Sequence, residues 1–544
     1  MDQKTNNTRP PQSGHNTSSS NQNRTRTNTQ NKGRFNKPGN RPNASGNSPR
    51  RAPSQMRMGG GMRSDKNKSG STSTRRETGN IPPPEKDVIR IIPLGGVEEV
   101  GRNMTMVELN DQIIVIDAGI GFADQDNPGI DYMVPNTKYL ELNKHKIKAM
   151  VITHGHLDHI GAIPYIIEKI GNPTIFTREF GALLIKAKVS DFPGLKLNIK
   201  IVEKEDGFIK LSEDFKVKFF GLSHSIPDST GVILETKFGD IVSTGDVRVD
   251  NIDGVPTEKE VEQYKVFKDR NVLLMTMDST GITTPGWSGA ESKVIETIDG
   301  IMKNVPGRLI ISTFASQVER IVEFIKLAKK YGKYVVVEGR SMKTNLGIVA
   351  ELKLTDMSHV IPVEEMNDYP PHKIMMLATG AQGEEFAAIM RMANGTHKQI
   401  KLAPTDTIIL SSSVIPGNEV PVTRLKDNLY RSDAKIITYL DNVVHASGHG
   451  KRDELMWIHK QINYKFFMPV HGWHHFLKIH AELAVANGAK PENVIVPDNG
   501  SVIEIINEGK EIVKRKEKVP GEAVIIDGLS VSDTQHLVIR DRKA

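Results

Sequence analysis

The chain has 544 residues, 37% of them apolar and 25% charged, which is the balance of a globular protein with room for about two to four domains. It contains no cysteine, so disulfides and thiolate chemistry are excluded, and only histidine and carboxylate side chains could hold a metal ion. Neither a secretory signal nor an apolar run of transmembrane length is visible. We therefore expect a cytoplasmic protein with no membrane partner.

The first 80 residues differ in charge from the rest of the chain. They contain 16 Lys and Arg against 3 Asp and Glu, a net charge of +13, so the remaining residues carry −6 within the total of +7. Phe35 is their only aromatic residue, and so few apolar side chains cannot offset the entropy of an ordered chain. We predict a disordered basic tail over residues 1–85. Its charge favours sequence-independent contacts with the phosphates of a polyanion, and the alternative is a solubility tail without a partner.

Apolar runs predict that the folded part begins near Asp87. Strands are expected over 88–92, 104–109 and 112–116. The third strand runs directly into Asp117. An acidic residue in that place either caps the next turn or belongs to a site, and the sequence leaves both interpretations open.

The densest group of polar side chains is the run Thr153-His154-Gly155-His156-Leu157-Asp158-His159, which follows the apolar residues 149–152. A buried strand that ends in a tight loop would bring its three imidazoles and its carboxylate together. Neutral imidazole nitrogens and carboxylate oxygens suit a divalent metal such as zinc. His154 and His156 are two residues apart on extended backbone and point the same way, whereas Asp158 and His159 follow a turn and can face a second ion.

Two more candidate ligands follow predicted strands further along the chain. Helical spacing is present over 160–170, and alternating strand and helix signals continue to residue 219. His224 and Asp246 each come just after a strand. A lone histidine in such a place is usually structural, but the upstream cluster needs distal ligands, so both residues are candidates.

These residues together resemble a known superfamily. Asp117, the His-X-His-X-Asp-His cluster, His224 and Asp246 occur in the order seen in metallo-β-lactamase-fold hydrolases. The resemblance implies an αββα sandwich with a two-metal site at one edge, where the ions lower the pKa of a shared water and hold a phosphodiester for in-line attack. It assigns His154, His156 and His224 to one ion, Asp158 and His159 to the other, and Asp246 to both.

The second half of the chain indicates which branch of the superfamily it resembles. A strand over 271–277 delivers Asp278, and a long α/β segment follows that small sandwich hydrolases do not have. The segment closes with the run His445-Ala446-Ser447-Gly448-His449-Gly450, and a later strand ends at His471. From Ile91 to Asp541 this pattern resembles the β-CASP nucleases, and within them the ribonuclease J family.

The resemblance implies an α/β fold in which a β-CASP domain is inserted into the αββα sandwich. We expect a disordered basic tail at 1–85, the first part of the metallo-β-lactamase domain at 86–288 and the β-CASP domain at 289–444. The second part of the metallo-β-lactamase domain and the start of a C-terminal extension occupy 445–544. Most relatives continue into a small C-terminal domain that supports dimers, so homodimer and homotetramer both stay open.

The resemblance also assigns chemical roles. His471 completes the shell of the second ion, while Asp278 and His449 form an acid/base pair in which His449 gives a proton to the leaving ribose oxygen. The stretch from His445 to His449 contacts the substrate, because small residues there let the backbone approach a phosphate. Those small residues are Ala446, Ser447 and Gly448.

Two weaker assignments follow from the same resemblance. Arg340, Ser341 and Phe314 would grip the 5′ end of RNA, with Arg340 paired to a phosphate and Phe314 stacked on a base. A structural arginine and a core phenylalanine are the alternative. Gly129, Asp131 and Asp527 would hold a structural calcium ion through hard oxygen ligands, and ordinary turn residues are the alternative.

The implied function is a metal-dependent ribonuclease of RNA maturation and decay, including rRNA processing. It would be a 5′-to-3′ exonuclease that prefers single-stranded RNA with a 5′-monophosphate, with endonuclease activity left open. Two divalent ions are expected, zinc first, with manganese or magnesium able to support activity, and other RNA-decay proteins are expected partners. The alternatives are a DNA-processing β-CASP nuclease and a non-catalytic RNA-binding scaffold. A scaffold would have lost metal ligands, whereas all seven His and Asp positions are present in this sequence.

Overall fold

The computed structural model describes residues 81–122, 132–204, 206–415, 418–527 and 530–532. The predicted disordered tail lies outside these residues, apart from its last five positions. None of the helices in the described ranges is both long enough and apolar enough to cross a membrane.

Two sheets form the centre of the larger domain. The first has the strand order β24-β23-β1-β2-β3-β6-β7-β8 and the second has the order β22-β15-β12-β11-β10-β9. The strands of the first are β1 (Ile89–Gly95), β2 (Met104–Leu109), β3 (Gln112–Ile116), β6 (Ile147–Val151), β7 (Ile175–Thr177), β8 (Ile199–Ile201), β23 (Ser501–Ile506) and β24 (Glu511–Lys518). Those of the second are β9 (Ile209–Lys210), β10 (Lys216–Gly221), β11 (Thr230–Thr236), β12 (Gly239–Ser243), β15 (Val272–Asp278) and β22 (Tyr464–Val470).

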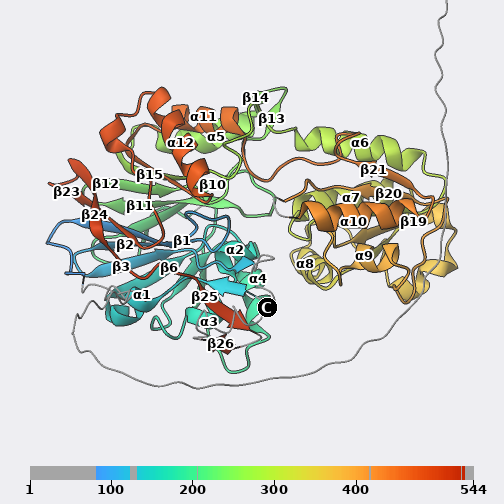
Figure 1. The fold of residues 1–544 in the computed structure, drawn as a ribbon, viewed down its shortest axis with the longest axis horizontal. Coiled ribbons are helices and arrows are strands. Elements are labelled where there is room, and N and C mark those ends of the chain that lie inside the picture. The colour runs from blue at the N-terminus through green and yellow to red at the C-terminus, as the bar shows by residue number, and fades with distance from the viewer. Residues whose placement is uncertain (1–80, 123–131, 205, 416–417, 528–529, 533–544) are drawn as a thin grey trace, which may run out of the picture. The chain divides into compact units, whose positions relative to one another are not determined.

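Helices cover the outer face of each sheet (Figure 1). The first sheet packs on α1 (Lys138–Leu142), α2 (Leu157–Ile160), α3 (Ile163–Ile166) and α4 (Glu179–Val189). The second packs on α5 (Glu258–Tyr264), α11 (Arg452–Gln461) and α12 (His474–Ala486). The core between the sheets joins residues such as Ile91 and Val151 of the first to Leu274 and Phe466 of the second, all fully buried. This arrangement is the predicted αββα sandwich.

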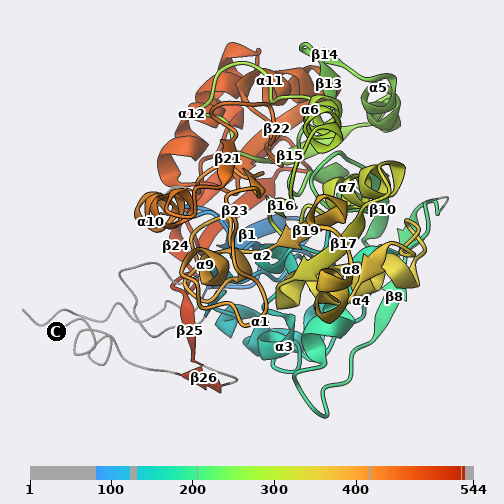
Figure 2. The same ribbon diagram turned by 90° about the vertical axis from the view of Figure 1, so that its right-hand side faces the viewer.

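The inserted domain is built on a parallel sheet with the strand order β18-β17-β19-β16-β20-β21. Helices α6, α7 and α8 pack on one face, and α9 and α10 pack on the other (Figure 2). The strands are β16 (Leu309–Ser312), β17 (Tyr334–Glu338), β18 (Val360–Ile361), β19 (Ile374–Ala378), β20 (Thr407–Leu410) and β21 (Lys435–Thr438). The helices are α6 (Glu291–Lys303), α7 (Val318–Lys330), α8 (Arg340–Glu351), α9 (Ala388–Ala393) and α10 (Glu419–Tyr430).

Short elements complete the described chain. They are β4 (Gly121–Phe122), β5 (Tyr132–Val134), β13 (Asn251–Ile252), β14 (Val255–Pro256), β25 (Val524–Asp527), β26 (Ser530–Ser532), η1 (Lys144–Lys146), η2 (Lys265–Phe267), η3 (Val363–Asp368), η4 (Pro371–Lys373) and η5 (Pro491–Asn493). The strand β25 returns beside β5, so the far end of the chain pairs with a segment near its beginning.

A shared apolar core joins the sandwich to the inserted domain. Phe180 of α4 and Ile226, which lies between β10 and β11, pack in one cluster with buried residues of α6, α7 and α8. Helix α4 also contacts α8 directly. Burial of this kind is the main favourable term in association, so the contact holds the inserted domain against the sandwich.

The strands predicted over 104–109 and 112–116 are confirmed residue for residue. The single helix expected over 160–170 is wrong, because the structure has α2 ending at Ile160 and the separate short α3 at 163–166. Pro164 lies in the first turn of α3, where its missing N–H is tolerated but from which a preceding helix could not continue. The periodic pattern was therefore produced by two packed turns rather than by one helix.

Candidate metal centre

Strand ends bring the predicted ligands together at one edge of the sandwich. Each candidate comes at the carboxyl end of a strand or in the loop that follows it; β3 and β6 are neighbours in the first sheet, β12, β15 and β22 are consecutive in the second, and β10 is separated from β12 by β11. Strand β3 leads to Asp117, β6 to the run from Thr153 to His159, β10 to His224, β12 to Asp246, β15 to Asp278 and β22 to His471. Segments as distant in sequence as 154–159 and 471 therefore meet.

A first group of ligand atoms comes from His154, His156, His224 and Asp246, and all lie within 4.8 Å of one another. His156 Nδ1 is 3.1 Å from both His154 Nε2 and His224 Nε2. Asp246 Oδ2 lies 3.7 Å from His154 Nε2 and 3.6 Å from His224 Nε2. His154 and His156 do point the same way, as predicted from their spacing, but the second presents Nδ1 rather than Nε2.

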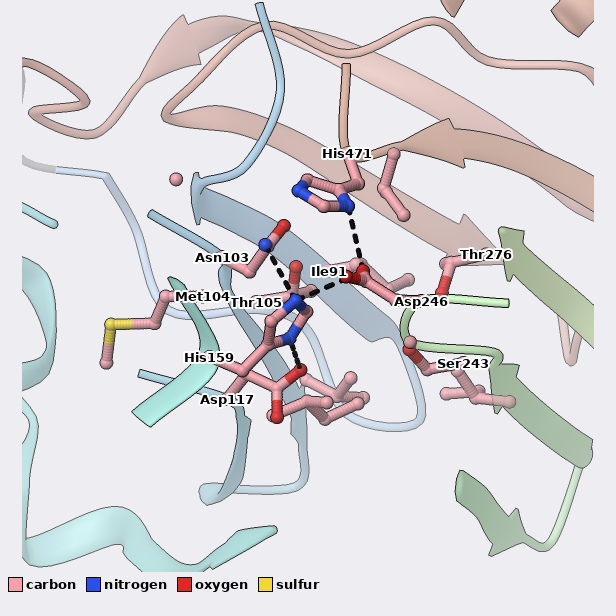
Figure 3. A pocket seen from close by; sticks show the side chains of 16 residues that line it. Ile91, Asn103, Met104, Thr105, Asp117, His159, Ser243, Asp246, Thr276 and His471 are labelled. Atoms are coloured by element: carbon pink, nitrogen blue, oxygen red, sulfur yellow. Dashed lines mark hydrogen bonds and ion pairs between the residues drawn. The ribbon is translucent and has the colours of Figure 1, made fainter. Parts of the chain in front are cut away.

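A second group consists of Asp158, His159, Asp246 and His471, again within 4.8 Å of one another. Asp246 Oδ1 lies 3.1 Å from His159 Nε2 and 2.8 Å from His471 Nδ1. Figure 3 shows His159 between Asp117 and Asp246, with His471 contacting the same Asp246 carboxylate from the opposite side. Asp246 thus belongs to both groups, one oxygen facing each.

Neighbouring groups determine which ring nitrogen is free to bind. His224 Nδ1 donates to the carbonyl oxygen of Gly448 at 2.5 Å, which leaves the Nε2 lone pair facing the first group. His159 Nδ1 lies 2.8 Å from Asp117 Oδ2, and the backbone N–H and hydroxyl of Thr153 donate to the same carboxylate. The sequence left open whether Asp117 caps a turn or belongs to a site, and the structure supports the second role. Asp117 orients His159 and is not itself a member of either group of ligand atoms.

Two of the strand-end residues have left-handed backbone. Asp117 has φ of +60° and His471 has φ of +54°, a conformation that costs a non-glycine residue on the order of 1–3 kcal/mol. The N–H of His471 donates to the carbonyl oxygen of Gly96 at 2.6 Å, which fixes the strained turn. Strain of this kind persists where surrounding structure over-determines a site.

The electrostatics divide the two groups. Burial, with the neighbouring imidazoles, lowers the pKa of His154 and His224 well below the usual value and lowers the pKa of His156 to about 4. These three rings are therefore neutral, the form that binds a metal. Burial opposes protonation of His159 and His471 too, but the carboxylates around them outweigh it and raise both pKa values. The carboxylates of the second group therefore favour positive charge at this place, which protons on the two rings supply without an ion and which a divalent cation would supply in their stead.

The donor set fits two divalent ions. Asp246 Oδ1 and His471 Nε2 are buried and have ionisable neighbours within 3.4 Å, yet neither makes a hydrogen bond of good geometry among the described residues, as expected for atoms that face a ligand. A cavity of about 30 Å³ adjoins them, lined by His159, Asp246 and His471 among others, and its size suits a water or an ion. Imidazole and carboxylate ligands without thiolate are compatible with zinc and with manganese.

His449 and Asp278 lie beside both groups. His449 Nδ1 is 2.7 Å from Asp278 Oδ2, and His449 Nε2 is 3.9 Å from Asp246 Oδ2. Burial alone would lower the pKa of His449, but attraction to Asp278 and Asp246 outweighs it and raises that pKa. The imidazole can therefore carry a proton on Nε2, next to the candidate ligands.

The predicted substrate residues lie at the carboxyl ends of parallel strands of the inserted domain. Phe314 follows β16, and its ring centroid is 6.4 Å from that of His445. Arg340 and Ser341 begin α8 directly after β17 and are exposed. Asn345 of α8 donates to the carbonyl oxygen of Ala315 at 2.7 Å and links the two loops. Ligands commonly bind at this edge of a parallel sheet.

Other predicted residues have different outcomes. Ala446 is buried in the core shared by the two domains, while Ser447 and His449 form a local turn through the Ser447 hydroxyl. The calcium assignment to Gly129 and Asp131 lies outside the described residues, and so does the side chain of Asp527.

Sequence reasoning missed residues that hold the site together. Asn103 Nδ2 lies 3.0 Å from His159 Nε2, and Thr153 Oγ1 lies 3.0 Å from His154 Nδ1. Arg320 contacts His445, although nothing in the motifs points to it. Its one signal was an arginine among the buried apolar positions of a helical pattern, beside Val318 and Ile321.

Three family models match successive parts of the chain. The metallo-beta-lactamase superfamily matches residues 97–274, the beta-CASP domain of ribonuclease J matches 306–429, and the RNA specificity domain of Zn-dependent metallo-hydrolases matches 433–497. The predicted combination of a metallo-β-lactamase sandwich with an inserted β-CASP domain is therefore confirmed.

Comparisons over most of the chain agree. The chain is 36% identical to ribonuclease J of Thermus thermophilus, in a match that covers 84% of this chain and 80% of that protein. It is 35% identical to ribonuclease J of Corynebacterium glutamicum over 86% of this chain, and it spans 65% of that relative's length. Among solved structures, a protein of unknown function from Enterococcus faecalis V583 has a TM-score of 0.53 and 15% identity, covering 77% of this chain and 100% of that one. This last likeness concerns the fold alone.

Proposed function

Since the chain belongs to the ribonuclease J family of metal-dependent ribonucleases, we propose that it hydrolyses single-stranded RNA from a 5′-monophosphorylated end, in RNA maturation and decay. One observation carries the proposal. Asp246 joins two groups of buried ligand atoms, and the pair Asp278 and His449 lies against the same carboxylate. That arrangement suits in-line displacement at a phosphorus atom, with a proton source on one side.

Seven residues would hold two divalent ions, zinc first, with manganese or magnesium as alternatives. His154, His156 and His224 would bind one, Asp158, His159 and His471 the other, and Asp246 both. When bound, the pair of ions supplies Lewis acidity that lowers the pKa of a water and balances the charge of the phosphate.

The protein's own groups account for the remaining steps. His449 is held by Asp278 through Nδ1, so Nε2 carries the proton that the leaving ribose oxygen takes up. The Asp278 carboxylate favours the protonated ring before transfer and orients it. Gly448 lies so close to His224 that a Cβ added to it would be 3.1 Å from a carbon of the His224 ring. The absence of a side chain therefore lets the loop pack closely on the candidate ligands.

The inserted domain would select the 5′ end. Arg340 is exposed at the start of α8, where an arginine can pair bidentately with a terminal monophosphate. Phe314 is half-buried beside His445 and presents a ring on which the first base can stack. A 5′ end held at these loops would release nucleotides one at a time, whereas endonuclease cleavage needs RNA to enter between the domains.

Further parts of the proposal follow from the sequence. The parts of the chain are a tail at 1–85, the sandwich at 86–288 and 445–544, and the inserted domain at 289–444. A cytoplasmic location agrees with the absence of cysteine from the sequence. Assembly as a homodimer or homotetramer, contact with other RNA-decay proteins, and a calcium site at Gly129, Asp131 and Asp527 belong to the same proposal.

The test uses an internally labelled RNA with a 5′-monophosphate, followed over time with and without a chelator. We expect mononucleotides from the 5′ end, a strong reduction with a 5′-triphosphate, and no products with chelator. His156→Ala should abolish turnover, whereas His372→Ala, an exposed histidine outside the site, should not. RNA left intact in manganese, magnesium and zinc alike would overturn the proposal, as would normal cleavage by His156→Ala.

The same assay separates the two alternatives. A DNA-processing nuclease of this class would cleave DNA of identical sequence in preference to RNA. A non-catalytic scaffold would bind RNA in every metal without cutting it. Two observations disfavour the scaffold. The set of candidate His and Asp ligands is complete, and Asp117 and His471 keep strained backbone that a site without function would not need.

A further inference from the structure

A buried arginine of the inserted domain reaches the loop that ends at His449. Arg320 lies on α7 and is 1% exposed, which makes it the largest fully buried side chain among the described residues. Its neighbours on the buried face of α7, Val318, Ile321 and Phe324, are apolar core residues. Burying a guanidinium is costly unless every donor is satisfied, so its presence calls for a function.

All five N–H groups of Arg320 have an acceptor within reach. Nε and Nη2 donate to the two carboxylate oxygens of Glu291, at 2.5 and 2.8 Å. Nη2 also donates to the carbonyl oxygen of Ala446 at 2.9 Å, and Nη1 donates to His445 Nδ1 at 3.0 Å. The carbonyl oxygen of Ser411 lies 3.5 Å from Nη1. Two of these contacts fall on the segment that carries the proposed substrate and acid groups.

The segment from His445 to Gly450 is anchored at both ends. At its far end the N–H of Gly450 donates to the carbonyl oxygen of Val247 at 2.8 Å, within the sandwich. In its middle the carbonyl oxygen of Gly448 accepts from His224 Nδ1. At its near end the contacts of Arg320 come from the inserted domain. A displacement of the near end would therefore be passed to His449, three residues beyond Ala446.

The arginine also sets the form of His445. A guanidinium can only donate, so a hydrogen bond to His445 Nδ1 requires the lone pair on that nitrogen and leaves the proton on Nε2. Burial and the adjacent charge lower the pKa of His445 to about 3, so the ring stays neutral. Nε2–H is then the ring's only donor, whatever acceptor it meets.

We infer that Arg320 is a positioning residue, which holds the loop of residues 445–449 from the inserted domain and thereby sets His445 and His449 against the RNA. The inference rests on the proposed function for its catalytic consequence, but the contacts themselves can be tested without it. It couples the placement of the inserted domain to the geometry of the ligand loop.

Lysine cannot replace Arg320 in this role, because one ammonium cannot span Glu291, His445 and Ala446 in a plane. A matched control exists in the same domain. Arg308 makes a bidentate pair with buried Asp406, at 2.9 and 2.6 Å, and that pair does not touch the 445–449 loop. Arg320→Lys and Arg308→Lys therefore remove the same kind of contact at two places.

The first measurement is hydrogen exchange of a peptide that covers residues 443–452, in the full chain. Arg320→Lys should speed exchange in this peptide, while Arg308→Lys should leave it at the wild-type rate. Glu291→Gln, which keeps the side-chain volume and loses the charge, should give a smaller change in the same direction. Equal exchange in Arg320→Lys and wild type would overturn the inference, whether or not the protein cleaves RNA.

The second measurement is cleavage of 5′-monophosphate RNA. Arg320→Lys should lower kcat by about tenfold or more, because a misplacement of about 1 Å at a catalytic group costs on the order of 10²-fold. Arg308→Lys should stay within about twofold of wild type, as expected for a contact far from the loop. If Arg320 acts through His445, Arg320→Lys adds little to the loss in His445→Ala.

The outcomes distinguish the two proposals. A wild-type chain that cleaves no RNA overturns the proposed function, while a change in exchange still supports the positioning role. An active wild type with equal kcat in Arg320→Lys and Arg308→Lys overturns the positioning role and leaves the function standing. Fully additive losses in the double variant with His445→Ala would overturn the part of the inference in which the arginine acts through His445.

Discussion

His449 Nδ1 lies 2.7 Å from Asp278 Oδ2, although 171 residues and the whole inserted domain separate the two in sequence. Asp278 ends β15 of the sandwich, and His449 arrives on the loop that leaves the inserted domain. The hydrogen bond thus closes the site from both sides.

His449→Ala should lower kcat by about 10²- to 10⁴-fold, the usual contribution of a general acid. The ligand atoms of the two metal groups do not depend on this ring, so the metal content of the purified variant should equal that of wild type. Single-turnover cleavage and elemental analysis measure the two quantities. A variant with wild-type kcat would show that the proton comes from elsewhere.

Asp117→Asn should weaken metal binding rather than remove a ligand. The carboxylate orients His159, and loss of such a partner typically costs about 10- to 100-fold in metal affinity. Competition with a chromophoric chelator measures the affinity for zinc. Asp240→Asn is the matched control. Asp240 is a buried carboxylate on β12, the strand that leads to Asp246, and it pairs with Arg270 instead of a histidine of the site. Equal affinities in the two variants would contradict the orienting role.

Glu260 should make the protein less stable as the pH rises above the ordinary pKa of a glutamate. Its side chain is fully buried, Oε1 accepts from Ser223, and Oε2 has no hydrogen-bond partner among the residues described. Burial raises the pKa of Glu260 above 4.5, so between 4.5 and the folded-state pKa the folded chain holds more protons than the unfolded chain. The contribution of Glu260 to the free energy of unfolding is then fully present below pH 4.5 and is lost as the pH rises through the folded-state pKa.

The corresponding experiment is urea unfolding of Glu260→Gln from about pH 4 to about pH 8, a range that spans the ordinary and raised pKa values of a glutamate. The variant should lose less stability than wild type over this range. Glu262→Gln, on the exposed face of the same helix, should keep the wild-type dependence. Identical slopes in Glu260→Gln and wild type would mean that the buried carboxyl does not titrate in this range.

Removal of residues 1–80 should reduce RNA affinity at low salt and leave cleavage at saturating RNA unchanged. The segment carries 16 Lys and Arg, and each phosphate contact that it makes adds to the slope of log affinity against log salt. Filter binding over a salt series would give a shallower slope for the shortened chain. Parallel lines for the two proteins would show that the tail does not contact RNA.

The sequence allowed us to predict which His and Asp side chains cluster, because the residue types are rare and their positions follow strands. His154, His156 and His224 were predicted as one group, and the structure brings their nitrogens within hydrogen-bonding distance. What could not be predicted was orientation. Which nitrogen of His156 faces its partners depends on the path of the chain after β6, and spacing alone carries no information on ring rotation.

The residues that support the site were hidden for a related reason. Arg320, Asn103 and Thr153 act through contacts between elements distant in sequence, and each taken alone is an ordinary residue of a helix or a loop. The expected helix over 160–170 failed because periodicity cannot distinguish one helix from two short ones around Pro164. Local pattern thus predicted most of the strands near the site and the candidate ligands, whereas their geometry depends on tertiary packing.

The split of the sandwich by the inserted domain has a consequence for synthesis of the protein. β15 pairs with β22, and β1 pairs with β23, so both sheets need strands that emerge from the ribosome only after the whole inserted domain. His449 and His471 emerge with them. A nascent chain consequently has an incomplete centre until these late strands have been made and have paired.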